Sequence, residues 1–173
     1  MAFLPVSAAA QAAWAAWCAE TGTDPATPLV VDRFGDSAAM ADALADLVAH
    51  GPKRATAGLL LDYDQSGDPL PFPGLHTIFL DGSDRPAVLV RTTRVEVRPF
   101  REVDEAFAWD EGEGDRTLAD WKAGHEAFFR RQLAGGPVPW SEDLPVVLER
   151  FALLRVFGRE ATAGSVRSSP GRR

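Results

Sequence analysis

The longest strand-like segment in the chain changes phase halfway along, and this restricts the folds that the chain can adopt. Residues 87–98 (AVLVRTTRVEVR) are rich in the β-branched residues that favour strands. Val88 and Val90 share one parity, whereas Val95 and Val97 share the other. A change of parity inside one strand indicates a β-bulge or a sharp bend, here near two adjacent threonines. The segment therefore predicts a small, strongly curved sheet of the barrel type.

The elements expected around this strand do not alternate as a doubly wound parallel sheet requires. Alanine-rich residues 7–20 predict a helix that Ser7 caps and that ends before Gly22. The other expected elements are a connector over 23–35, a helix from Asp36 or Ser37 to Gly51, strands over 55–61 and 76–80 with a turn-rich stretch over 62–74 between them, an acidic and partly looped stretch over 102–120, a helix capped by Thr117, and a strand over 146–157. This order predicts an α+β fold with a curved antiparallel sheet and flanking helices.

The length of 173 residues favours one domain. We divide the chain into an N-terminal helical extension (1–28), a main domain (29–157) and a tail (158–173). The tail is rich in glycine, serine and arginine, which predicts a disordered basic segment.

Composition excludes several classes of protein. Eighteen basic and twenty-five acidic residues give a net charge of −7, which argues against a general nucleic-acid coat protein. Cys18 is the single cysteine, so an intrachain disulfide and a cysteine-based zinc cluster are excluded, and the three histidines lie far apart. We expect neither a metal nor a cofactor. No apolar run approaches the ~18 residues of a membrane span, and residues 1–5 lack the basic start of a signal peptide. We therefore expect a cytoplasmic protein without membrane contact.

The first candidate site lies where the second helix meets a strand. Lys53 stands three residues before Thr56, and Gly51 and Pro52 hold the junction in a defined shape. A lysine supplies a point charge for a phosphate or carbonyl oxygen. A desolvated lysine also loses its proton more readily and can activate a neighbouring hydroxyl. The same residues also fit an exposed loop lysine beside a strand threonine.

Two charged groups form the other candidates. Glu111 and Glu113 alternate with glycines, and such a cluster can bind a cation, supply a general acid or base, or accept hydrogen bonds from a ligand's amino group. A solvated loop without function is the alternative. The arginines of the long strand form either a phosphate-facing stripe or a solubilising edge. They are Arg91, Arg94, Arg98 and Arg101.

Several spaced motifs occur together in a fixed order between residues 30 and 157. They are Phe34-Gly35-Asp36, Gly51-x-Lys53-x-x-Thr56, Leu80-Asp81-Gly82, the stretch from Arg91 to Val97, the stretch from Glu111 to Leu118 with Trp121, His125 with Phe128-Phe129, and Glu142 to Val147 with Glu149-Arg150-Phe151. In this combination the chain resembles the ASCH domain family. The resemblance implies a PUA-like β-barrel with flanking helices, whose cleft binds RNA or nucleosides.

The resemblance also implies site residues. Some members of the family are amidohydrolases that remove the acyl group from N4-acetylcytidine with a lysine, a threonine and a glutamate. By motif these correspond to Lys53, Thr56 and Glu113, with Glu111 as the alternative acid. In this hypothesis Thr56 attacks the acyl carbonyl, Lys53 takes the hydroxyl proton, and Glu113 protonates or orients the leaving amine.

Two further hypotheses remain open. A ribonuclease or RNA-binding module would place Lys53, Arg54 and Arg94 on phosphates and stack Tyr63 on a base of single-stranded RNA. A non-catalytic sensor would use the same cleft for a small nucleoside-type ligand. In each case we expect a cleft lined by basic residues within an acidic protein.

Overall fold

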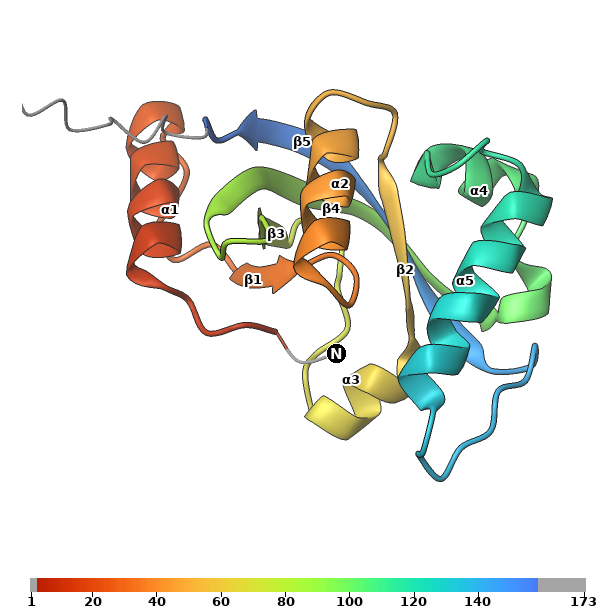
Figure 1. Cartoon of the computed structure of the whole chain (residues 1–173). Coiled ribbons are helices and arrows are strands. Elements are labelled where there is room, and N and C mark those ends of the chain that lie inside the picture. Colours follow the sequence, from red (N-terminus) through yellow and green to blue (C-terminus); the bar gives the residue numbers. More distant parts are fainter. Residues whose placement is uncertain (1–2, 159–173) are drawn as a thin grey trace, which may run out of the picture.

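A curled sheet of five strands organises the chain (Figure 1). The computed structural model describes residues 3–158. Its strands are β1 (Leu29–Arg33), β2 (Ala55–Leu59), β3 (His76–Leu80), β4 (Pro86–Pro99) and β5 (Pro145–Val156). They lie in the order β1-β3-β4-β5-β2, with β1 parallel to β3 and all other neighbours antiparallel. The sheet therefore forms a half-barrel, as the predicted α+β, PUA-like fold requires.

The curl comes from irregularities in the long strand β4. Its pairing with β5 shifts register between Leu89 and Val90 and again between Thr92 and Arg94. Such bulges bend a strand and increase its twist. The second shift lies at the threonines where the valine pattern changes phase, so the predicted bulge is confirmed.

Five α-helices flank the sheet in the described residues. They are α1 (Ala8–Thr21), α2 (Ala38–Ala49), α3 (Leu60–Ser66), α4 (Glu105–Glu111) and α5 (Leu118–Leu133). The predicted caps are confirmed, because the side chains of Ser7, Ser37 and Thr117 each accept a backbone N–H of the first turn. None of these helices is long and apolar enough to cross a membrane.

Three elements differ from the expected order. The connector over 23–35 contains β1, because its apolar residues pair with β3. The first pair in this register is Leu29 with His76, which lies 47 positions later in the sequence. The turn-rich stretch begins with α3, which starts directly after Leu59 and so ends the strand expected over 55–61 two residues early. The acidic stretch contains α4, whose first turn is capped by Asp104.

The buried apolar residues form three clusters, one of which packs α2 on the sheet through Val48, Phe79 and Val88. Beside β1 and β3, the apolar side of α1 packs on the sheet through Ala10, Trp14 and Cys18. Beside β2 and β5, aromatic side chains of α4 and α5, such as Phe107 and Phe129, cover the strands. Figure 1 shows α1 at one end of the sheet and α4 with α5 at the other, with α2 between them.

The described part of the N-terminal extension therefore shares its core with the sheet. Trp14 is 7% exposed, lies 5.2 Å from the ring of His76 between centroids, and donates its Nε1 hydrogen to the carbonyl of Pro25. The division of the chain at residue 28 stays a prediction. The predicted disordered basic tail, residues 158–173, lies outside the described residues except for Gly158.

We expect Trp14→Ala to lower the free energy of unfolding by about 3 kcal/mol, because the substitution leaves a large cavity in the core. Urea unfolding of the full chain measures this change. The control is Trp109→Ala, since Trp109 is 58% exposed and should cost less than about 1 kcal/mol. Equal effects of the two substitutions would show that α1 is not part of the folding unit.

Candidate functional site

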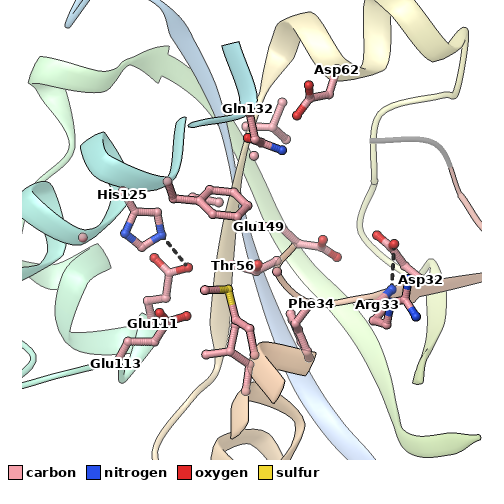
Figure 2. Close-up of a pocket in the computed structure, with 18 of the residues that line it drawn as sticks. Asp32, Arg33, Phe34, Thr56, Asp62, Glu111, Glu113, His125, Gln132 and Glu149 are labelled. Carbon is pink, nitrogen blue, oxygen red and sulfur yellow. Dashed lines mark hydrogen bonds and ion pairs between the residues drawn. The ribbon is translucent and has the colours of Figure 1, made fainter. Parts of the chain in front are cut away.

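One cavity of about 440 Å³ opens between the core cluster that contains Phe34 and Phe79 and the cluster that contains Trp121 (Figure 2). Pockets that bind small molecules have volumes of ~300–1,000 Å³. Residues of β1, α2, β2 and α3 line one part of it, and residues of α4, α5 and the loop between them line the other. Four of the predicted site residues line it, namely Thr56, Tyr63, Glu111 and Glu113.

The backbone around Lys53 is held between the ends of two helices. Its N–H donates to the carbonyl of Leu47 in α2, and the N–H of Arg54 donates to the carbonyl of Asp110 in α4. Gly112, at φ +72°, ends α4 beside this segment, and a Cβ there would lie 2.7 Å from the nitrogen of Lys53. Only glycine fits both the left-handed conformation and this close approach. The start of β2 is thereby joined to the acidic loop.

Lys53 is fully buried and lies between two carboxylates. Its Nζ donates to Oε1 of Glu113 at 2.5 Å and to Oε1 of Glu111 at 3.3 Å. The ring of Phe34 lies below the ammonium, 5.4 Å from Nζ to the ring centroid. A buried charge is tolerated only when it is paired in this way. The alternative of an exposed loop lysine is therefore wrong.

Glu111 is the centre of a wider network. Besides Lys53, it accepts a hydrogen bond from Nε1 of Trp121, and Nε2 of His125 lies 3.4 Å from its Oε1. Burial alone would raise the pKa of Glu111, but the charges of His125 and Lys53 and these hydrogen bonds hold the pKa well below its usual range. Three donors therefore occupy this carboxylate.

His125 completes the network, and its surroundings favour the imidazolium form. Burial would lower its pKa, but the charge and hydrogen bond of Glu111 outweigh this effect and raise the pKa. Its Nδ1 lies 3.0 Å from the carbonyl of Trp121, and the two rings stack with centroids 4.1 Å apart. Both ring nitrogens thus face acceptors. Sequence reasoning gave His125 no role, although its spacing of four from Trp121 places both on one face of a helix.

Glu113 differs from Glu111 in its access to the cavity. Its side chain is 30% exposed, against 1% for Glu111, and both contact the same ammonium. Glu113 is consequently the acid that a ligand can reach.

Thr56 lies in the middle of the cavity wall. It pairs with Glu149 across β2 and β5, so the two side chains share one face of the sheet with Cβ atoms ~5 Å apart. In the view of Figure 2, Thr56 lies between the Glu111–His125 pair and the carboxyls of Glu149 and Asp32. Thr56 and Glu113 therefore line one cavity, and Lys53, which has no exposed surface, adjoins it through its contacts with Glu111 and Glu113.

A second pair of carboxyls, those of Glu149 and Asp32, lines the far wall, and sequence reasoning gave neither of them a role. The pKa of Glu149 is raised to about 7, mainly by burial and also by the charge of Asp32. The hydrogen bond from the Thr92 hydroxyl lowers it in part. Burial also raises the pKa of Asp32 to about 6, although the N–H of Arg33 donates to its Oδ1. Burial and these carboxylates raise the pKa of Tyr63, which lines the same wall.

Two of the predicted site residues point elsewhere. The guanidinium of Arg54 donates to the carbonyls of Val48 and Lys53 and so supports the backbone. The side chain of Arg94 is 62% exposed and pairs with Glu96. Neither lines the cavity. Arg98 of the same strand also pairs with Glu96.

The expectation of a basic cleft is wrong. Two arginines line the cavity, Arg33 and Arg131, whereas the carboxyl groups number six. They belong to Asp32, Asp62, Glu111, Glu113, Asp120 and Glu149. The residues were too far apart in the sequence to show that the fold would gather them. Within residues 3–158, no group of three or more His, Cys, Asp or Glu side chains is arranged to hold a metal ion.

Fold and cavity together define an α+β protein of PUA-like type, with an enclosed lysine–carboxylate cluster at the edge of a curled half-barrel. The model of the ASCH domain family matches residues 30–155, so the chain belongs to the ASCH domain family. The resemblance seen in the sequence motifs is confirmed.

Two crystal structures are similar to this chain. A protein from Enterococcus faecalis V583 is 32% identical with a TM-score of 0.78, and the match covers 91% of this chain and 95% of that one. The ASCH domain from Lactobacillus crispatus JV V101 is 32% identical with a TM-score of 0.68, covering 73% of this chain and 79% of that one. None of the curated proteins matches the chain.

The stability of the protein should fall as pH rises because of Glu149. Its folded pKa of about 7 lies above the unfolded value of 4.5, so the folded state binds more protons between these values. The stabilisation relative to an ionised carboxyl is complete below pH 4.5 and is lost as pH rises through 7. The unsubstituted protein should lose this stabilisation between pH 5 and pH 8, whereas Glu149→Gln should not. The free energy of unfolding of the variant, relative to that of the unsubstituted protein, should therefore rise by about 2–3 kcal/mol over this interval.

Urea unfolding at both pH values measures this difference, with Glu102→Gln as the matched control at an exposed position. The control should follow the pH dependence of the unsubstituted protein. If Glu149→Gln also follows it, the carboxyl of Glu149 ionises without cost and the buried pair is not as described.

Proposed function

We propose that the chain hydrolyses the amide of an N4-acylated cytosine nucleoside. The observation that carries the proposal is that Thr56 and Glu113 line one cavity and that Nζ of the buried Lys53 lies 2.5 Å from Oε1 of Glu113. These three residues match the lysine, threonine and glutamate of the amidohydrolase branch that the sequence resembles. Membership of the ASCH domain family supports this choice of reaction.

The contact between Lys53 and Glu113 supports a proton relay. Lys53 passes a proton to Glu113, and the resulting amine takes the hydroxyl proton of Thr56 as its Oγ1 attacks the acyl carbonyl. The C–N bond then breaks, and the proton held by Glu113 goes to the exocyclic nitrogen of the leaving cytosine. The products of this step are free cytidine and an acyl ester on Thr56, with Lys53 again an ammonium and Glu113 a carboxylate. Water hydrolyses the ester to release the acid.

Glu111 has a different part in this scheme. Its carboxylate is occupied by Trp121, His125 and Lys53. It therefore holds the lysine in place while Glu113 exchanges the proton.

RNA binding or RNA cleavage is less well supported at this cavity. Contacts with phosphates need available cations. Arg33 pairs with Asp84, Arg131 pairs with Asp36, and Lys53 is enclosed by two carboxylates. A small nucleoside fits these charges better than single-stranded RNA.

The direct test is incubation of the protein with N4-acetylcytidine, with cytidine release followed by chromatography. Removing the nucleophile in Thr56→Val should lower kcat by at least ~10²-fold, and removing the proton relay in Glu113→Gln should lower it by a similar factor. Thr93→Val is the matched control, since Thr93 lies exposed on β4 and donates to a backbone carbonyl. It should retain full activity.

Each alternative gives a different result. No cytidine above background at high protein concentration contradicts the amidohydrolase. Binding of N4-acetylcytidine without turnover favours a non-catalytic sensor. Cleavage or retention of single-stranded RNA, weakening steeply with salt, favours the RNA hypothesis.

A further inference from the structure

The cavity wall opposite the Lys53 cluster carries hydrogen-bond acceptors. Glu149 and Asp32 lie there, on β5 and β1, and Gln132 of α5 also lines the cavity. Oε1 of Gln132 is buried and has no hydrogen-bond partner in the described part of the chain. A buried acceptor without a partner carries a free-energy penalty, which a ligand that supplies a donor removes. This wall therefore favours ligands with several N–H or O–H groups.

The charges around this wall oppose phosphates. The cations nearest to it are already engaged, because Arg33 contacts Asp84 at 2.9 Å and Arg131 contacts Asp36 at 3.1 Å. A phosphate placed beside Asp32 and Glu149 would meet like charges in a partly enclosed space, where their repulsion is stronger than in water. Hydroxyl groups instead gain charge-assisted hydrogen bonds from carboxylates.

The position of Glu149 relates this wall to the proposed reaction. Glu149 is the cross-strand neighbour of Thr56, so the wall begins beside the residue that would attack the acyl group. In a nucleoside the sugar extends away from the base and its exocyclic nitrogen. A nucleoside with its N4 group at Thr56 and Glu113 can thus direct its sugar toward the carboxyl wall, and a cavity of about 440 Å³ has room for both parts.

We propose that Asp32, Gln132 and Glu149 form a subsite that binds the sugar hydroxyls of an unphosphorylated nucleoside and rejects the corresponding 5′-phosphate. The proposal rests on the proposed function for the orientation of the base. In this proposal the subsite, and not the reacting residues, makes the pocket select a nucleoside over a nucleotide.

Binding without turnover tests this subsite. We would titrate the full chain at pH 8 with cytidine, cytosine and cytidine 5′-monophosphate by isothermal titration calorimetry. Cytidine should bind at least ~10-fold more tightly than cytosine, because its hydroxyls donate to the wall. Cytidine 5′-monophosphate should bind at least ~100-fold more weakly than cytidine, because its phosphate is repelled.

Variants show whether the wall causes this preference. Glu149→Gln should weaken the binding of cytidine about 10-fold and leave the binding of cytosine unchanged. It should also reduce the difference in affinity between cytidine and cytidine 5′-monophosphate. Gln132→Leu, which removes the unpaired acceptor, should weaken the binding of cytidine and of its monophosphate by the same factor. Glu102→Gln is the exposed control and should change none of these values.

The outcomes separate this subsite from the proposed reaction. Equal or tighter binding of the monophosphate, equal binding of cytosine and cytidine, absence of cytidine binding, or an unchanged profile in Glu149→Gln would overturn the subsite. Preference for cytidine that Glu149→Gln reduces supports it, even if N4-acetylcytidine is not hydrolysed. Hydrolysis of N4-acetylcytidine together with equal hydrolysis of its 5′-phosphate supports the reaction and overturns the subsite.

Discussion

The ammonium of Lys53, buried between Glu111 and Glu113, determines how the elements around the cavity are arranged. A lysine with no exposed surface needs partners that arrive with it during folding. α4 delivers them, because its last residue is Glu111 and Gly112 lets its end approach the backbone of Lys53. Trp121 and His125 of α5 then hold Glu111. One buried charge thus joins β2, α4 and α5.

This arrangement divides the cavity into two electrostatic halves. On one side, Lys53 contacts Glu111 and Glu113, and His125 contacts Glu111, so a proton that moves within this cluster leaves its net charge unchanged. On the other side, Asp32 and Glu149 have few counter-charges, and burial raises their pKa values to about 6 and about 7, so both carry a negative charge at pH 8. The first half suits proton exchange during a reaction, whereas the second half suits recognition of neutral donors. A cavity lined throughout by acidic groups would suit recognition of neutral donors but would lack the lysine that proton exchange requires.

The sequence predicted those parts of the structure that depend on local patterns. Side-chain caps at Ser7 and Thr117 and the bulge at Thr92 depend on a few neighbouring residues, and the spacing of Lys53 and Thr56 indicated two residues of the candidate site. β1 was missed because a parallel partner far along the chain, and not local periodicity, makes it a strand. Glu149 and Asp32 were missed because they meet only after β1, β3, β4 and β5 have paired, so no motif contains both.

The two glutamates of the acidic loop show why neither could replace the other. Glu111 belongs to the helix and enters the core, whereas the left-handed turn at Gly112 reverses the chain so that Glu113 reaches the same ammonium from the cavity side. A lysine held only by Glu113 would lose its buried partner whenever that carboxyl took up a proton. With Glu111 also present, the lysine keeps one ionised neighbour through each proton transfer. Glu111 therefore holds the lysine in place during the transfer, and its charge favours the return of the proton to Lys53.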